Sequence, residues 1–363
     1  YEDEIEVSWR AGADAVLLIA RILDLPKLLS LAASCRALGM TPFVEVRERD
    51  DVPKLAAAAK AGRVHAGVNS RDLATFRIDP LVPATLRTSL PCRTVFESGA
   101  STPGACRFAR QLGFDGVLIG EAAARNPSSA GALVSAFRDS RPDWVGHFWR
   151  EIGRRGSRKP LVKICGLTRA EDALLAAELG ADMLGFVFAP SPRQTDELAV
   201  RDISHRLDEM YGRPLSANPE AAGARRPLLV GVVTDAESER SKTAFKLVCE
   251  GVLDAIQYHG ENHASDLPMI DAAGGSYGIG RYSVVRLGSE GDVARIDALA
   301  LNGEPRVLVD ARVEGIAGGT GTTIPKNLVR LVSANHGLWL AGGINPGNVK
   351  AYINEFNPEL LDI

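Results

Sequence analysis

Short apolar segments rich in β-branched residues alternate with Ala- and Leu-rich segments along the whole chain. In the first part the apolar segments are AVLLIA (15–20), FVEV (43–46), HAGV (65–68), RTVF (93–96) and GVLI (116–119), spaced about 22 to 28 residues apart. The intervening segments, such as LPKLLSLAASCRALGM and TPGACRFARQLGF, have helical periodicity and a glycine just past the last turn. This alternation predicts βα units and a parallel sheet.

The alternation continues to the end of the chain. Eight strand candidates follow in order: PLVKI, ADMLGFVF, LLVGVV, LDAIQY, YSVVRL, RVLVDA, GLWLAG and ELLDI. Helical segments such as AEDALLAAELG lie between them. Eight βα units predict a closed (β/α)8 barrel.

The length of 363 residues favours two domains, because single hydrophobic cores stop growing near 250 to 300 residues. Residues 141–160 (RPDWVGHFWREIGRRGSRKP) break the alternation, and we interpret them as a connector. Their basic run is more typical of a solvated helix end than of an anion site. We expect Trp144, Phe148 and Trp149 to pack on a barrel flank. Residues 211–227 are rich in Pro, Gly and Ala, which predicts a surface insertion.

The composition argues for small-molecule chemistry. Hydrophobic residues make up 45% and charged residues 24% of the chain, and no apolar run is long enough to span a bilayer. The net charge of -3 predicts no binding to nucleic acid or anionic membranes. The five cysteines are scattered and odd in number, which argues against a disulfide framework or a zinc site. We therefore expect a cytoplasmic protein.

Polar residues follow several predicted strands of the second part, at the end where barrels carry their active sites. Cys165 ends the first of these strands, although a single cysteine there is more often inert core filler. Asp310 could cap a strand or pair with Arg312. Arg193 could be a surface side chain. Gly342 and Gly343 follow the seventh strand, where barrels commonly bind phosphate, although a tight turn without a ligand is the alternative.

Six motifs of the second part, KICGLTR, GFVFAPSPR, AIQYHGE, LVDAR, GGTG and LAGGINPGNV, resemble in order those of phosphoribosylanthranilate isomerases. The resemblance implies that Cys165 is the general base on the sugar C2′, and that Asp310, after the sixth strand, is the general acid. It implies no cofactor and no metal, and it gives His259 a supporting role only. The implied substrate-binding residues are Arg193 for the anthranilate carboxylate and Gly319, Gly321, Gly342 and Gly343 for the phosphate.

The first part carries GADAVLLIARIL, LGMTPFVEVRE, GVNSRDLATFRID, TVFESGAST and GFDGVLIGEAAARNP, which resemble strands four to eight of indole-3-glycerol phosphate synthase. The resemblance implies that Glu45 is an acid/base carboxylate and that Asn69 orients the substrate. By themselves, Glu45 could be a solvent-side charge and residues 69–72 an Asx-capped turn. The implied supporting and phosphate-binding residues are Arg71, Ser98, Gly99 and Gly120.

Together the resemblances predict two (β/α)8 TIM-barrel domains in tandem, the first represented only by its C-terminal five βα units and the second nearly complete. The expected boundaries are 1–140, 141–160 for the linker, and 161–363. The family's lysines on synthase strands one and three and a Ser-Ser-Gly-Val-Glu stretch after the last strand are expected beyond the two ends. Without those first strands, the sheet should expose two parallel edges.

The implied function is bifunctional. The isomerase would convert N-(5-phosphoribosyl)anthranilate to 1-(2-carboxyphenylamino)-1-deoxyribulose 5-phosphate by an Amadori rearrangement. In the intact parent protein, the synthase would close that product to indole-3-glycerol phosphate with loss of carbon dioxide and water. The expected partners are these phosphorylated anthranilate substrates. The sequence does not indicate whether the protein forms oligomers. The alternatives are another phosphate-binding barrel enzyme and a catalytically inactive remnant or assembly module.

Overall fold

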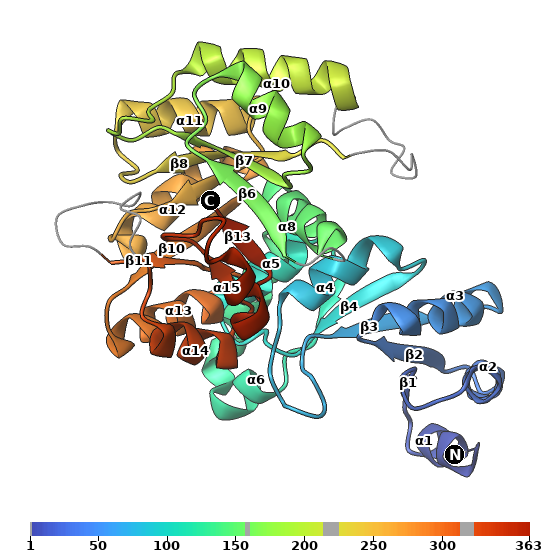
Figure 1. Cartoon of the computed structure of the whole chain (residues 1–363). Coiled ribbons are helices and arrows are strands. Elements are labelled where there is room, and N and C mark those ends of the chain that lie inside the picture. The colour runs from blue at the N-terminus through green and yellow to red at the C-terminus, as the bar shows by residue number, and fades with distance from the viewer. Residues whose placement is uncertain (1, 157–159, 213–224, 313–322) are drawn as a thin grey trace. The chain divides into compact units, whose positions relative to one another are not determined.

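The computed structural model describes residues 2–156, 160–212, 225–312 and 323–363, and the chain divides into two compact units (Figure 1). The front unit consists mainly of residues up to Pro142 and also includes Trp149–Gly153 and Leu301–Pro305. The rear unit comprises the remaining residues from Asp143 onward.

The front unit is built on one parallel five-stranded sheet in the order β1-β2-β3-β4-β5, so β1 and β5 are its open edges. All five strands occur where the sequence predicts them, although β5 is shorter than expected. Their bounds are β1 Ala15–Ile19, β2 Thr41–Val46, β3 His65–Asn69, β4 Arg93–Glu97 and β5 Gly116–Val117. The register places Glu45 beside Gly67, and Asn69 beside Glu97.

The front helices begin and end where local chemistry predicts. Helix α2 starts after Asp24, whose side chain accepts a hydrogen bond of 2.8 Å from the Lys27 amide. It is followed by Gly39, whose positive φ of 80° suits a helix C-terminus. The front helices are α1 Glu2–Arg10, α2 Leu25–Ala37, α3 Val52–Lys60, α4 Leu81–Leu86, α5 Pro103–Gln111, α6 Glu121–Arg125 and α7 Ala130–Arg138.

The rear unit is a closed parallel barrel with the strand order β10-β11-β12-β13-β6-β7-β8-β9 (Figure 1). The last strand, β13, pairs with both β12 and β6 and so closes the ring. This confirms the predicted eight-stranded barrel. The strands are β6 Leu161–Cys165, β7 Met183–Val187, β8 Leu228–Val233, β9 Ala255–Tyr258, β10 Arg281–Leu287, β11 Leu308–Ala311, β12 Trp339–Leu340 and β13 Leu360–Asp362.

Helices alternate with these strands, and one more helix lies within the predicted connector. Phe148 of that helix, α8, is fully buried and stacks on Tyr282 with ring centroids 6.0 Å apart. Most of the predicted insertion at 211–227 lies outside the described residues. The helices are α8 Trp144–Arg155, α9 Ala170–Glu178, α10 Glu197–Tyr211, α11 Glu239–Cys249, α12 His263–Ala273, α13 Val293–Leu301, α14 Lys326–Asn335 and α15 Val349–Phe356.

The rear barrel has an apolar layer outside its strands and several polar groups inside. Aliphatic and aromatic side chains fill the space between strands and helices. Inside the ring, the Tyr282 hydroxyl donates a 2.8 Å hydrogen bond to Gln257 Oε1, and Lys163 is completely buried. A buried lysine is rare unless it is paired. Among the described residues, no helix is long and apolar enough to cross a membrane.

Candidate functional site

A pocket of about 410 Å³ opens at the C-terminal ends of the rear barrel strands. Cys165 and Asp310 both line it, although 145 residues of sequence separate their positions. The structure therefore brings the two proposed proton carriers into one cavity. Among the described residues, no group of three or more His, Cys, Asp or Glu side chains is arranged to hold a metal ion.

Cys165 is the last residue of β6, as the sequence predicts. Its amide donates a 2.9 Å hydrogen bond to the Ile363 carbonyl, which ties this strand end to the closing strand β13. Burial raises the pKa of the Cys165 thiol, and the Asp362 carboxylate adds to that rise. Lys163 and Arg193 oppose the rise, because their positive charges favour the thiolate.

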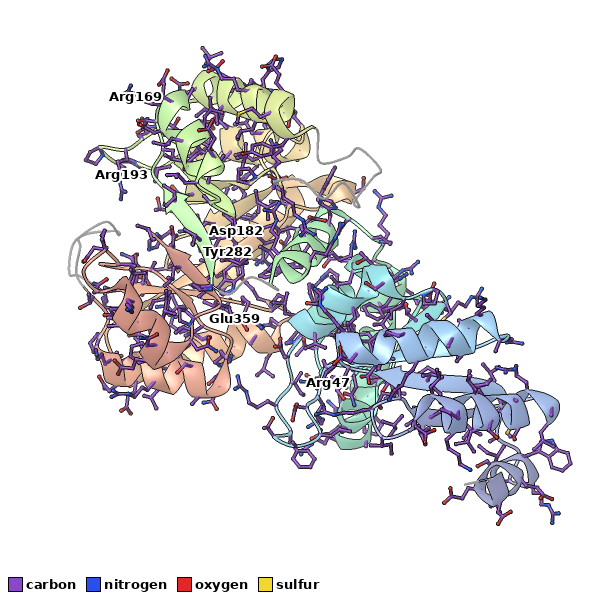
Figure 2. All side chains as sticks on the ribbon, turned by 45° about the vertical axis from the view of Figure 1, so that its right-hand side comes forward. Arg47, Arg169, Asp182, Arg193, Tyr282 and Glu359 are labelled. Atoms are coloured by element: carbon purple, nitrogen blue, oxygen red, sulfur yellow. The ribbon has the colours of Figure 1, made fainter. Side chains whose placement is uncertain are left out.

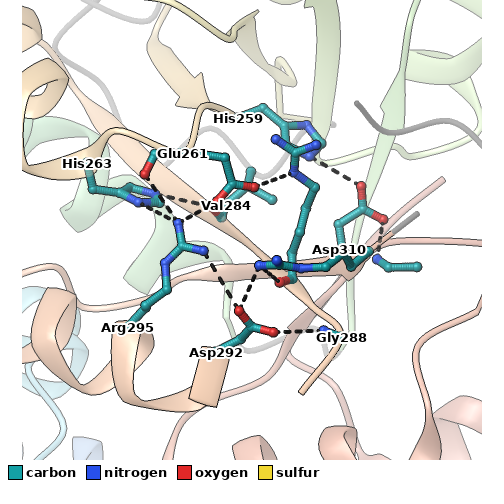
Figure 3. A network of polar contacts seen from close by, with 11 residues as sticks. His259, Glu261, His263, Val284, Gly288, Asp292, Arg295 and Asp310 are labelled. Carbon is teal, nitrogen blue, oxygen red and sulfur yellow. Dashed lines mark hydrogen bonds and ion pairs between the residues drawn. The ribbon is translucent and has the colours of Figure 1, made fainter. Parts of the chain in front are cut away.

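Asp310 lies within β11 rather than after it and faces His259, as Figure 3 shows. The distance from His259 Nε2 to Asp310 Oδ2 is 3.3 Å. The alternative pairing of Asp310 with Arg312 is wrong, because Arg312 contacts Asp292 at 2.7 Å. His259 therefore has a definite place in the pocket, beside the Asp310 carboxylate.

The C-terminal ends of β9 and β10 are joined by a separate network of ion pairs, also seen in Figure 3. Glu261 pairs with Arg286 at 2.9 Å and with Arg295 at 2.8 Å. Asp292 accepts a 2.9 Å hydrogen bond from the Gly288 amide. These ion pairs join Glu261, after β9, to Arg286 of β10 and to Arg295 of α13.

Arg193 lies in the loop after β7 and extends away from the ribbon (Figure 2). Its Nη1 donates a 3.2 Å hydrogen bond to the Cys165 carbonyl, and it lines the pocket. Gly166, with a φ of 84°, allows this approach, because a Cβ there would lie 2.8 Å from Arg193 Cδ. The remaining guanidinium nitrogens suit a planar carboxylate ligand.

The glycines expected to bind phosphate are only partly described. Gly342 and Gly343 follow β12, line the pocket and have positive φ angles of 84° and 65°. Two asparagines, Asn345 and Asn348, donate hydrogen bonds of 3.1 and 2.8 Å to the Gly343 carbonyl, so this loop has a defined shape. Gly319 and Gly321 lie outside the described residues.

Sequence reasoning missed an ion pair in the floor of this pocket. Lys163 Nζ lies 2.7 Å from Asp362 Oδ2, and both side chains are buried. Asp362 also lines the pocket beside Cys165. A signal was present, because the apolar segments PLVKI and LLDI each contain one charged residue. Which charges meet depends on the closure of the barrel.

The front sheet carries a second group of polar residues at the C-terminal ends of its strands. Glu45 on β2 is only 7% exposed, so the solvent-side alternative is wrong. It lies in contact with Glu97 of β4 and acts on the carboxyl group of that residue. Burial, together with the Glu45 charge, raises the pKa of Glu97 to about 8. The Glu97 carboxyl group therefore favours its protonated form at neutral pH.

Asn69 is held by two hydrogen bonds to its Oδ1 atom. The Arg71 amide and the Ser98 hydroxyl each donate to it at 2.9 Å. The first bond is an Asx-type turn, so the structural alternative for this segment is partly right. Because the Ser98 hydroxyl already donates to Asn69, it must leave that bond before it can donate to a phosphate.

The other residues proposed for the front site follow the C-terminal ends of β3, β4 and β5. The Arg71 guanidinium lies 3.6 Å from the Glu121 carboxylate, and both side chains are partly exposed. Gly99 has a φ of 76°, and a Cβ there would lie 2.8 Å from Ile78 Cγ2. Gly120 precedes the short helix α6, and no atom lies within 4 Å of a Cβ built there. A small group can approach the Gly120 backbone closely.

Two family models match this chain. The model described as indole-3-glycerol phosphate synthase matches residues 2–135, the region of the front sheet. The model described as N-(5'-phosphoribosyl)anthranilate isomerase matches residues 215–363. Strands β6 and β7 precede this second match, although they belong to the same closed barrel.

Individual relatives cover either both units or the rear unit alone. The multifunctional tryptophan biosynthesis protein of Schizosaccharomyces pombe is 28% identical over 373 residues, which are 97% of this chain and 45% of the relative. The chain thus spans about half the length of such multifunctional relatives. The solved phosphoribosyl anthranilate isomerase from Thermotoga maritima is 29% identical with a TM-score of 0.42, covering 56% of this chain and 86% of that one.

The N-(5'-phosphoribosyl)anthranilate isomerase of Pseudomonas fluorescens is 33% identical over 203 residues, which are 55% of this chain and 83% of the relative. This coverage includes most of an independent isomerase. The chain therefore belongs to the N-(5'-phosphoribosyl)anthranilate isomerase family and joins that domain, in one polypeptide, to an indole-3-glycerol phosphate synthase domain.

Proposed function

We propose that the rear unit isomerises N-(5-phosphoribosyl)anthranilate to 1-(2-carboxyphenylamino)-1-deoxyribulose 5-phosphate in tryptophan biosynthesis. The observation that carries this proposal is the shared pocket of Cys165 and Asp310 at the C-terminal ends of the barrel strands. The rearrangement needs one group that gives a proton and one that takes a proton, both within reach of a single sugar. The identity of the substrate is inferred from the isomerase family to which the chain belongs.

In the proposed reaction, Asp310 protonates the ring oxygen of the ribosylamine, and the ring opens to a Schiff base. The Cys165 thiolate then removes the C2′ proton, which gives an enol that tautomerises to the ketone product. His259, 3.3 Å from Asp310, is placed to hold that carboxyl group in position. Arg193 at the pocket edge binds the anthranilate carboxylate, while Gly342 and Gly343 contact the phosphate, together with Gly319 and Gly321.

The protonation state of Cys165 sets the expected pH dependence. Because the net environment raises the pKa of this thiol, the thiolate fraction is small at neutral pH and grows as pH rises. We expect kcat to increase with pH above neutrality. An enzyme whose rate falls over this range would need another group as the base.

The direct test replaces each proton carrier. Cys165→Ala and Asp310→Asn should each lower kcat roughly 100- to 10,000-fold, because positioned proton transfer contributes that much. Turnover is measured by the loss of substrate fluorescence. Cys249→Ala, on an exposed cysteine of α11, is the matched control and should retain parental kinetics.

Two outcomes would remove the assignment. Near-parental turnover by either pocket variant would exclude these residues as the proton carriers. A folded parent chain that does not consume the substrate above background would favour an inactive remnant or assembly module. Consumption of a different sugar phosphate instead would favour another phosphate-binding barrel enzyme.

A second reaction is favoured by the carboxyl pair of the front sheet. There, the decarboxylating ring closure to indole-3-glycerol phosphate would use Glu45 as the acid/base carboxylate and Asn69 to orient the substrate. Arg71 supports Asn69, and Ser98, Gly99 and Gly120 are the phosphate contacts. We propose functional boundaries at residues 1–140 and 161–363 with a linker at 141–160.

The two reactions can be separated by one substitution. In the intact parent protein, which carries the synthase lysines, Glu45→Gln should lower the formation of indole-3-glycerol phosphate, measured by indole fluorescence, and leave isomerase turnover unchanged. A parallel loss of both activities would show that the substitution disturbs the whole chain. An unchanged synthase rate would remove Glu45 from the mechanism.

A further inference from the structure

A completely buried lysine lies directly below the proposed base. Lys163 and Cys165 are two residues apart on β6, so their side chains point to the same face of the strand. That face is the barrel interior, where Lys163 has no exposed surface and pairs with Asp362 at 2.7 Å. Nothing in the proposed proton transfers has yet used this ion pair.

Gly185 on β7 shows how near the lysine is to the thiol. A Cβ at Gly185 would lie 2.6 Å from Cys165 Sγ and 3.0 Å from Lys163 Nζ. The sulfur and the nitrogen are therefore at most 5.6 Å apart, the sum of those two distances. The absence of a Gly185 side chain leaves this space open, so the charge of Lys163 acts directly on the Cys165 sulfur.

We infer that Lys163 is a positioning residue for Cys165, whose ammonium group, held by Asp362, orients the sulfur and stabilises it as a thiolate. This inference rests on the proposed isomerase function and deepens it. Lys163 does not touch the substrate in this scheme. It acts through the sulfur that does.

The other charged and titratable groups around the sulfur show why the lysine is needed. Asp362 opposes a thiolate, and its Oδ1 atom has no hydrogen-bond partner among the described residues. Arg193 favours the thiolate from the pocket edge, and Tyr282 faces Lys163 from β10. Burial disfavours the charged form of the lysine, yet Asp362, Cys165 and Tyr282 together hold its pKa above the ordinary value. The ammonium therefore persists beside the thiol at every working pH.

The test measures the thiol itself rather than the isomerase reaction. The unmodified chain and a Lys163→Met variant are alkylated with iodoacetamide from pH 6 to pH 10, and the peptide carrying Cys165 is quantified by mass spectrometry. We expect the variant to react at least about tenfold more slowly at neutral pH, which corresponds to an upward shift of about one pKa unit. Exposed Cys249 serves as the internal reference and should react equally in both proteins.

A second variant tests the same contact while all the charges remain in place. Gly185→Ala puts a methyl group between Cys165 Sγ and Lys163 Nζ, and we expect it to slow alkylation of Cys165 in the same direction. Gly231→Ala is the matched control. It also lies within a barrel strand, but its Cβ would contact only apolar side chains of Leu253, Ala244 and Ile256.

The outcomes separate this inference from the proposed function. A folded Lys163→Met or Gly185→Ala protein whose Cys165 alkylation profile matches the parent would overturn the role of Lys163, whatever the kinetics. If Lys163→Met does not fold by circular dichroism, the Gly185→Ala result decides. If Cys165→Ala keeps full turnover while both profiles shift, the isomerase mechanism fails and the lysine–thiol coupling stands.

Discussion

A Glu97→Gln variant should make the stability of the front unit nearly independent of pH between 5 and 8. Glu97 is buried and in hydrogen-bonding contact with Glu45, and one of its oxygens has no hydrogen-bond partner among the described residues. The carboxyl group therefore favours its protonated form in the folded protein. A glutamine has the same shape, stays neutral, and can donate a hydrogen bond to Glu45 as the protonated carboxyl group does.

The size of the effect follows from the raised pKa. Burial, followed by the charge of Glu45, moves the pKa of Glu97 from 4.5 in the unfolded chain to about 8 in the folded one. A group with a raised folded pKa contributes its full stability below the unfolded value and loses it as pH rises through the folded value. From pH 5 to pH 8 the parent should lose roughly 3 to 4 kcal/mol, at about 1.36 kcal/mol for each pKa unit.

Hydrogen–deuterium exchange of peptides from β3 and β4 measures this local stability. After correction for intrinsic exchange, protection in the parent should fall across this pH range, while protection in Glu97→Gln stays level. Glu121→Gln, at an exposed glutamate of the same unit, is the control and should keep the parental slope. If protection changes with pH equally in the parent and in Glu97→Gln, the proposed protonation of buried Glu97 is wrong.

Two further substitutions test the geometry of each unit. Gly67→Ala should also flatten the pH slope, because its Cβ would lie 1.6 Å from Glu97 Oε1 and expel that side chain. Gly116→Ala, whose Cβ would lie 3.3 Å from the apolar Val95 Cγ2 and would displace no carboxylate, is its control in the same exchange experiment. Arg193→Lys should raise the isomerase KM about tenfold and change kcat little, since loss of a bidentate contact weakens binding by about 1.4 kcal/mol. A kcat effect as large as the KM effect in steady-state kinetics would contradict a pure binding role.

Strand positions and order were predictable because they depend on local properties. A strand such as FVEV is apolar on both sides of Glu45, and the following helix shows its own period and terminal glycine. Cys165 was placed correctly at a strand end for the same reason, because its position follows from where the apolar run stops. Glu45 also proved buried, and the signal for this was its apolar neighbours Phe43, Val44 and Val46.

Contacts between distant polar groups were not predictable in this way. The hydrogen bond between Lys163 and Asp362 joins residues 199 positions apart, and it exists because β13 pairs with β6. The partner of Asp310 proved to be His259 instead of Arg312, because β11 ends at Ala311 and Arg312, beyond its end, pairs with Asp292.

The amino-acid sequence by itself determined the alternation of βα units, the eight strands of the rear barrel and the strand ends that carry the polar residues. Only the tertiary structure decided which of those residues meet: Glu45 with Glu97, Cys165 with Lys163, and Asp310 with His259. The reason is that periodicity reports which face of an element is buried, whereas a contact between elements depends on strand register, barrel closure and the space left by glycines such as Gly67 and Gly185.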